Sequence, residues 1–150
     1  MRYTLLLALA ILLFTTCKKD KFTTAPQINY KSIAPNVVDN LSASPVITFS
    51  ITDAEGDIGI NANNTAFIYI KNLLVNAFDS LPFPDLQSGA KRNFEAEVDI
   101  TVPSSVLKCK SLPNGALHTD TVFFEIYVKD FAKNKSNLIT TAEPLYFICR

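Results

Sequence analysis

The chain has 150 residues with 14 basic and 14 acidic side chains, so its formal net charge is zero and its length fits one domain rather than two. Balanced charge argues against a nucleic-acid-binding protein, which needs a basic face, and 48% hydrophobic residues with 19% charged ones argue against a disordered chain. The absence of G-x-G and G-K-[ST] motifs excludes a phosphate-binding loop, and a single His with three Cys excludes a zinc finger or a His-rich metal site.

Residues 1–16 have the features of a secretory signal peptide. Arg2 supplies a positive charge, and ten apolar residues follow from Leu5 to Phe14, which is fewer than the roughly 20 that span a bilayer. Cleavage after Thr16 would leave a mature chain that begins at Cys17. A buried helix of the domain is the alternative, but ten apolar residues in a row leave such a helix no polar face for solvent.

Cys17 lies where bacterial lipoproteins carry the cysteine that becomes acylated. Residues 13–17, Leu-Phe-Thr-Thr-Cys, resemble a relaxed lipobox of the Bacteroidota type, with bulkier residues than usual at two positions. The resemblance implies lipidation of Cys17 and anchoring in the outer membrane. An ordinary secreted protein with a structural Cys17 is the alternative. Asp20 is the one acidic residue among three lysines after Cys17, which leaves both the periplasmic face and the cell surface open.

The body of the chain, residues 27–150, has the period-two alternation of apolar and polar residues that predicts β-strands. The alternation is clearest in 47–51, 94–102 and 122–128. Residues 17–26 before it are expected to form a short solvated tether. The expected strands, in chain order, cover residues 27–38, 45–53, 65–73, 93–102, 120–130 and 137–149, with a further short strand within 74–90.

These strands predict an all-β fold. Proline-marked turns and the near absence of helical periodicity favour an antiparallel two-sheet sandwich of about seven strands, Ig-like or fibronectin-III-like. An antibody-type domain is excluded, because the chain has no Trp and neither 45–53 nor 120–130 contains a Cys. A closed barrel is the alternative. Pro144 interrupts the last strand, where we expect an edge or a bulge.

Two cysteines, Cys109 and Cys149, are left for the folded domain. Cys109 follows the strand expected at 93–102, and Cys149 ends the last strand. In a sandwich of this order both positions lie at the same pole. An exported chain permits a disulfide between them, and two unpaired thiols are the alternative.

Two loops follow directly on strong strand patterns. Residues 53–59 read Asp-Ala-Glu-Gly-Asp-Ile-Gly, and residues 130–137 read Asp-Phe-Ala-Lys-Asn-Lys-Ser-Asn. They resemble the D-G-D-G-D-I-G and D-x-A-x-N-x-S-N segments of small, mostly uncharacterised Bacteroidota lipoproteins with an Ig-like domain, although Ala54 and Glu55 depart from the first pattern. The resemblance implies a cell-envelope location and an Ig-like fold, and it implies no activity.

In an Ig-like order these two loops share one pole, so Asp53, Glu55, Asp57 and Asp130 are expected to converge. Carboxylates, Asn side chains and backbone carbonyls are the oxygen ligands that Ca²⁺ takes, and the D-x-E-x-D spacing partly matches the first positions of a calcium loop. Calcium is therefore the candidate cofactor. The alternative is turn chemistry, in which Asp and Asn bond their own backbone and the two loop glycines supply positive φ.

No catalytic set is evident in the sequence. His118 is the single His, a solvated loop position is expected for it, and nothing indicates a triad with Ser105 and Asp120. No G-x-S-x-G motif is present. Glu95, Glu97 and Asp99 alternate along one strand and are expected to face solvent. We therefore expect a protein that is not an enzyme.

The expected function is a lipid-anchored, non-catalytic interaction module of the cell envelope, with an envelope protein or a glycan as its partner. One alternative is an accessory subunit of an envelope complex. Its interface would use an apolar stripe on neighbouring strands, unless residues 73–91 fold over it; the stripe comprises Phe67, Tyr69, Phe123 and Tyr127. The other alternative is a small envelope hydrolase, favoured only by His118 and the carboxylates.

Overall fold

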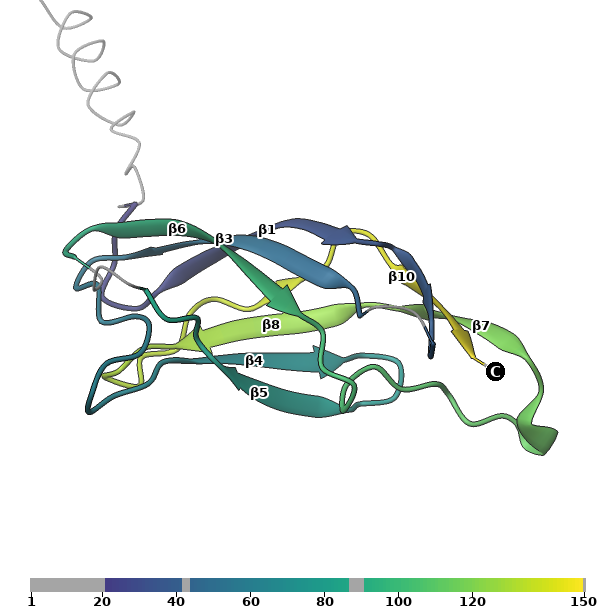
Figure 1. Ribbon diagram of the computed structural model, residues 1–150. Coiled ribbons are helices and arrows are strands. Elements are labelled where there is room, and N and C mark those ends of the chain that lie inside the picture. The colour runs from purple at the N-terminus through teal and green to yellow at the C-terminus, as the bar shows by residue number, and fades with distance from the viewer. Residues whose placement is uncertain (1–20, 42–43, 87–90, 150) are drawn as a thin grey trace, which may run out of the picture.

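The computed structural model describes residues 21–41, 44–86 and 91–149, which form an all-β sandwich (Figure 1). The expected signal peptide at 1–16 and the expected lipidation site Cys17 lie outside the described residues. Within the described ranges, no helix is long and apolar enough to cross a bilayer. A turn of 3₁₀ helix, η2, covers Pro113–Gly115.

Two layers of strands face each other across the core (Figure 1). The first layer has the strand order β1-β3-β6, with β1 at Gln27–Ala34, β3 at Val46–Asp53 and β6 at Phe94–Thr101. The second has the order β5-β4-β8-β9, with β4 at Phe67–Asn72, β5 at Phe78–Pro82, β8 at Phe124–Lys129 and β9 at Ile139–Thr140. All neighbours in both layers run antiparallel. The predicted Ig-like two-sheet sandwich is thus confirmed.

A third, smaller sheet continues the second layer toward one end of the molecule. Its order is β2-β10-β7, with β2 at Val37–Asp39, β10 at Leu145–Cys149 and β7 at His118–Val122. The strand expected at 120–130 is therefore split into β7 and β8, and the one expected at 137–149 is split near Pro144 into β9 and β10. β2 pairs with β10 in parallel, so the sandwich is not entirely antiparallel.

The short strand expected within 74–90 is β5, and a turn fixes its place. The buried Asn72 accepts the N–H groups of Leu74 at 2.9 Å and Val75 at 3.3 Å through Oδ1, and its Nδ2 donates to the carbonyl of Val106 at 3.0 Å. The turn sends the chain back along β4. β5 therefore adds an edge strand to this sheet instead of folding over its outer face.

The alternation of apolar residues places the core between the layers. Fully buried side chains include Ile47, Phe49, Ile68 and Ile126, and Phe83 joins them from a connecting segment. Each such side chain contributes roughly 1.5–3 kcal/mol relative to an exposed position. The opposite face of β6 carries exposed acidic residues, as predicted. The packed layers provide a rigid support for the loops at both ends.

Residues 21–26 correct the prediction of a solvated tether, because this part of it is bonded to the domain. Lys21 Nζ lies 2.6 Å from Glu95 Oε2, and the Lys21 carbonyl accepts the hydroxyl of Thr52 at 3.0 Å. The carbonyl of Thr23 accepts the N–H of Ala54 at 3.1 Å. The reason is the register: β1 begins opposite the end of β3, so the residues before β1 run past the loop that follows β3.

Candidate functional site

The two loops predicted to converge lie together at the end of the sandwich where β3 and β8 end. Asp57 joins them, because its carbonyl accepts the N–H of Phe131 at 3.0 Å and its Oδ2 accepts the N–H of Ala132 at 3.2 Å. We call residues 53–60 and 130–137 the acidic pole. The predicted meeting of these loops is confirmed.

Asp53, the last residue of β3, is fully buried in the acidic pole. Its Oδ2 accepts the N–H groups of Gly56 at 2.6 Å and Asp57 at 3.2 Å, and Gly56 adopts the positive φ of 69° that the turn requires. Neither Asp53 Oδ1 nor Asp57 Oδ1 has a hydrogen-bond partner among the residues that the structure describes. Burial raises the pKa of Asp53 to about 6, although the hydrogen bond from the N–H of Gly56 lowers it. The charge of Asp57 raises this pKa further. Turn chemistry therefore explains one oxygen of Asp53 and not the other.

Asp130 is fully buried as well, but both of its oxygens have partners. Oδ1 accepts the backbone N–H of Asn134 at 2.8 Å, and Oδ2 accepts Nδ2 of the same residue at 2.8 Å. Burial raises the pKa of Asp130 and these two hydrogen bonds lower it, while the charge of Asp57 raises it further. Turn chemistry accounts for Asp130, whose carboxylate braces its own loop.

Three carboxylates of the first loop lie close enough to share a cation. One oxygen from each of Asp53, Glu55 and Asp57 lies within 4.8 Å of the others. A pocket of about 270 Å³ opens beside them, and its lining includes Glu55 and Asp57. Of the four predicted calcium ligands, these three form one group, whereas Asp130 is bonded within its own loop. The arrangement offers oxygen ligands only, as a hard cation prefers.

The last two polar residues of the second loop support the backbone around the acidic pole. Ser136 Oγ accepts the N–H of Val128 at 2.9 Å and donates to the carbonyl of Asn137 at 2.7 Å. Asn137 accepts the N–H of Ile28 through Oδ1 and donates to the Ile28 carbonyl through Nδ2, both at 2.8 Å. These contacts fasten β1 to the connection between β8 and β9. The motif at 130–137 is thus a scaffold for the pole.

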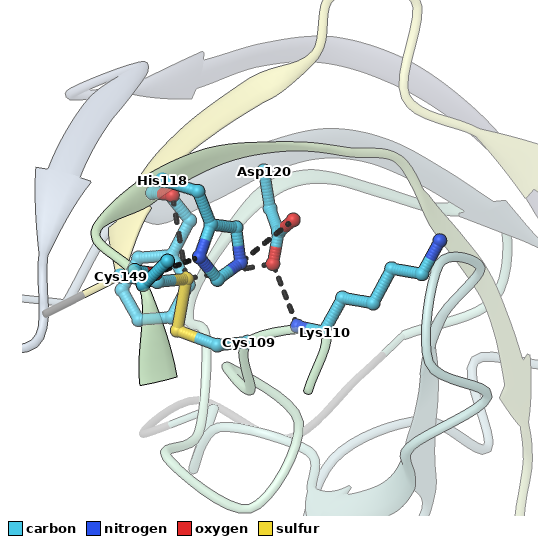
Figure 2. A network of polar contacts seen from close by, with 7 residues as sticks. Cys109, Lys110, His118, Asp120 and Cys149 are labelled. Atoms are coloured by element: carbon cyan, nitrogen blue, oxygen red, sulfur yellow. Dashed lines mark hydrogen bonds and ion pairs between the residues drawn. A yellow bond between two sulfur atoms is a disulfide. The ribbon is translucent and has the colours of Figure 1, made fainter. Parts of the chain in front are cut away.

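Figure 2 shows the opposite end of the sandwich, which we call the disulfide pole and define as Cys109, Lys110, His118, Asp120 and Cys149. The expected disulfide joins Cys109 to Cys149, with their Cα atoms 5.9 Å apart. Asp120 is 7% exposed, and its Oδ2 accepts the N–H of Lys110 at 2.7 Å. The same oxygen lies 3.4 Å from the sulfur of Cys149, which has no proton to donate because it is oxidised. At this end, a covalent bond therefore joins the end of β10 to the segment between β6 and β7.

The disulfide pole provides neither a nucleophile nor a metal site. Its sulfurs are bonded to each other, so neither is the thiolate that both roles require. Ser105, which a catalytic triad with His118 and Asp120 would need as its nucleophile, donates to Asp79 of β5 instead. His118 is not the solvated loop residue that was expected, because it begins β7 and its buried Nε2 lies 3.4 Å from Asp120 Oδ1. The alternation that buries Val122 also carries Asp120 inward, a signal that the sequence reading missed.

The outer face of β5, β4 and β8 carries stacked aromatic side chains. Tyr69 and Tyr127 lie directly opposite each other, with ring centroids 4.6 Å apart and an interplanar angle of 7°. Phe78 stacks on Tyr69 at 5.9 Å and is 54% exposed. Two of the four residues of the expected stripe, Tyr69 and Tyr127, are therefore stacked on this face, and Phe78 joins them. Phe67 shares this face of β4, and Phe123 lies in the break between β7 and β8.

Comparison with protein-family models, with curated proteins and with solved structures gives no match for this chain. The function is therefore inferred from the chemistry of its own surfaces. At the acidic pole, Asp53 and Asp57 each have an oxygen with no hydrogen-bond partner among the described residues. At the disulfide pole, a disulfide joins Cys109 to Cys149. The outer face of one sheet carries stacked aromatic rings, of which Phe78 is exposed. Of these three regions, the outer sheet face combines stacked aromatic rings with the exposed side chains of Phe78 and Leu138.

Proposed function

We propose that the protein is a lipid-anchored, non-catalytic binding module of the cell envelope, which binds a partner protein through the outer face of β5, β4 and β8. The observation that carries the proposal is the stack of Tyr69, Tyr127 and Phe78, which we call the aromatic row. Phe78 is exposed, and the two tyrosines are half-buried. Aromatic side chains dominate the binding energy of many protein interfaces, because each one buries a large area at a low cost in conformational entropy.

The aromatic row is organised before any partner arrives. Its rings are held by their neighbours across the strands, so little side-chain entropy is lost on binding. Lys129 Nζ lies 5.4 Å from the ring centroid of Tyr69, and Lys135 Nζ lies 4.1 Å from that of Tyr127. The face thus has an apolar centre with lysines beside it. It fits a partner surface that is apolar at its centre and acidic at its rim.

The stacking favours a protein over a glycan as the partner. Tyr69 lies between Tyr127 and Phe78, so neighbouring rings cover both of its faces. A sugar ring stacks on an open aromatic face, whereas an aromatic side chain of a partner protein can meet the exposed ring edges. Leu138, 50% exposed beside the row, adds aliphatic surface of the kind that a protein partner covers.

The expected anchor at Cys17 supports an envelope location. Cys17 precedes Lys21 by four residues, a span of at most about 14 Å. Lys21 is bonded beside the acidic pole, so an anchored domain would hold this pole near the membrane. The aromatic row, on a side face of the sandwich, would stay accessible to other envelope proteins.

The anchor is tested by mass spectrometry of protein extracted from membranes. We expect the mature chain to begin at Cys17 and to carry the added mass of fatty acids on that residue. Cys17→Ser should move the protein into the soluble fraction. A wild-type protein that is soluble and unmodified at Cys17 would contradict the proposed anchor.

The binding surface is tested by capture from detergent-solubilised native membranes with the wild type and two variants. Phe78→Ser removes the most exposed ring of the aromatic row, and Tyr146→Ser removes a ring of β10 that is 41% exposed and lies outside the row. We expect Phe78→Ser alone to lower partner affinity by about tenfold or more, with both variants folded by circular dichroism. Equal binding by the two variants would contradict this surface, and a captured polysaccharide would replace the protein partner with a glycan.

A further inference from the structure

The acidic pole contains a buried carboxylate whose charge the protein does not balance. Asp53 is fully buried, and its Oδ1 has no hydrogen-bond partner in the described part of the chain. The buried Oδ1 of the half-buried Asp57 also has no hydrogen-bond partner among the described residues. A buried ionised carboxylate normally has hydrogen-bond donors or an opposite charge beside it, because desolvation strongly disfavours an isolated charge. The charged group that acts on Asp53 is the like-charged carboxylate of Asp57, so either a shared proton or a cation must balance the pair.

The geometry of these oxygens suits a single ion of the size of calcium. Ca²⁺ binds oxygens at about 2.3–2.6 Å, so two ligands on opposite sides of one ion lie no more than about 5 Å apart. One oxygen from each of Asp53, Glu55 and Asp57 lies within 4.8 Å of the others. The N–H groups of Gly56 and Asp57 hold Asp53 Oδ2 and so fix the orientation of its carboxylate.

We propose that Asp53, Glu55 and Asp57 form a calcium site in the loop between β3 and β4. The ligands are oxygens from one irregular loop, which favours Ca²⁺ over Mg²⁺, since Mg²⁺ demands near-ideal octahedral geometry. The adjoining pocket gives water access to complete the six to eight ligands that Ca²⁺ takes. The site is independent of the aromatic row, which lies on the outer face of another sheet.

The bound ion would act on both loops of the acidic pole. Asp57 is a ligand of the ion and also accepts the N–H groups of Phe131 and Ala132 from the second loop. Fixing its side chain therefore fixes the contact between the loops. Asp130 serves as a positioning residue, because its bonds to Asn134 shape the second loop without supplying a ligand.

The site is tested by equilibrium dialysis of radioactive Ca²⁺ with the purified full chain in detergent, after treatment with a chelator. We expect one ion per chain, with a dissociation constant in the range of about 10⁻⁴–10⁻³ M that is typical of extracellular modules. Asp57→Asn, Asp53→Asn and Glu55→Gln should each weaken binding by about tenfold or more. Asp99→Asn, on the exposed face of β6, should bind Ca²⁺ like the wild type.

A melting curve in chelator separates loss of the site from loss of the fold. Asp53→Asn removes a buried charge beside Asp57, so its melting temperature without calcium should equal or exceed that of the wild type, while its response to Ca²⁺ disappears. Glu55→Gln changes an exposed side chain and should melt like the wild type in chelator. Absence of Ca²⁺ binding by the wild type, or unchanged binding by all three variants, would overturn the proposal in favour of a proton shared by Asp53 and Asp57.

Discussion

Both ends of the sandwich bury aspartate side chains, and Asp120 at one end and Asp53 at the other differ in the partners of their carboxylates. Asp120 at the disulfide pole receives the N–H of Lys110 and lies beside His118 (Figure 2). Asp53 at the acidic pole receives two N–H groups on one oxygen, and its neighbour is the like-charged Asp57. The disulfide pole also has a covalent bond between Cys109 and Cys149, whereas hydrogen bonds through Asp57 join the loops at the other end.

This difference teaches that the buried carboxylate at one end receives its partners from the protein, whereas at the other end one oxygen each of Asp53 and Asp57 has no hydrogen-bond partner among the described residues. A disulfide constrains its loop at every pH and salt concentration in an oxidising compartment. A cluster of carboxylates repels itself until a proton or a cation compensates it. The acidic pole is therefore the end whose stability depends on solution conditions. It is also the end from which the expected lipid tether leaves the domain.

Removal of the disulfide should have the largest effect on stability. The bond joins residues 40 apart in the sequence, which corresponds to about 4 kcal/mol in the chain-entropy model. We expect the double variant Cys109→Ala/Cys149→Ala to lose most of this free energy of unfolding in urea titrations. Thiol labelling of the unfolded, non-reduced wild type should find neither cysteine free, and labelling of both would contradict the bridge.

The second effect is a pH dependence of the calcium-free protein. The pKa of Asp53 rises from 3.8 to about 6, so between these values the folded state binds more protons than the unfolded state. Its contribution to stability is thus present below pH 4 and falls as pH rises to 6, by on the order of 3 kcal/mol. Urea titrations in chelator should show this fall for the wild type and not for Asp53→Asn. If the free energies of unfolding of the wild type and of Asp53→Asn changed with pH in the same way, the unbalanced charge of Asp53 would be contradicted.

A smaller effect is expected from the scaffold of the acidic pole. Asn137→Ala leaves both the N–H and the carbonyl of the buried Ile28 without their partners. Lost hydrogen bonds to buried groups cost about 1–3 kcal/mol. Asn29→Ala, an exposed position on β1, serves as the control and should change stability by less than about 0.5 kcal/mol. A difference between the two variants smaller than the error of the urea titration would argue against this supporting role of Asn137.

The main strands were predictable because buried and more exposed residues alternate along most of their length, although β1 has an irregularity between Tyr30 and Ser32. The splits were harder to predict: Val122 and Phe124 are both buried, so the alternation runs through the point where β7 ends and β8 begins. What changes there is the hydrogen-bond partner, from β10 to β4. β5 has no fully buried residue, so its alternation was weak, and the turn at Asn72 decided its neighbour.

The meeting of the two acidic loops was predictable because antiparallel order puts the ends of β3 and β8 at one pole. The different roles of Asp53 and Asp130 within the acidic pole were not predictable, because they depend on which carboxylate oxygens accept a hydrogen bond. Asp130 is followed four residues later by Asn134, which binds both of its oxygens. Asp53 is followed three residues later by Gly56, which has only a backbone N–H to offer. The same turn chemistry therefore provides partners for both oxygens of Asp130 and for only one oxygen of Asp53.

Hydrogen exchange with and without millimolar Ca²⁺ tests the contrast between the two ends most directly. Exchange of backbone amides reports local opening, and bound ligand slows it where the ligand restrains the chain. We predict slower exchange at residues 53–60 and 130–137 when Ca²⁺ is present, and unchanged exchange at residues 107–120, which include four of the five residues of the disulfide pole. Equal exchange in Ca²⁺ and in chelator throughout both poles would contradict the claim that the acidic pole needs a cation to be complete.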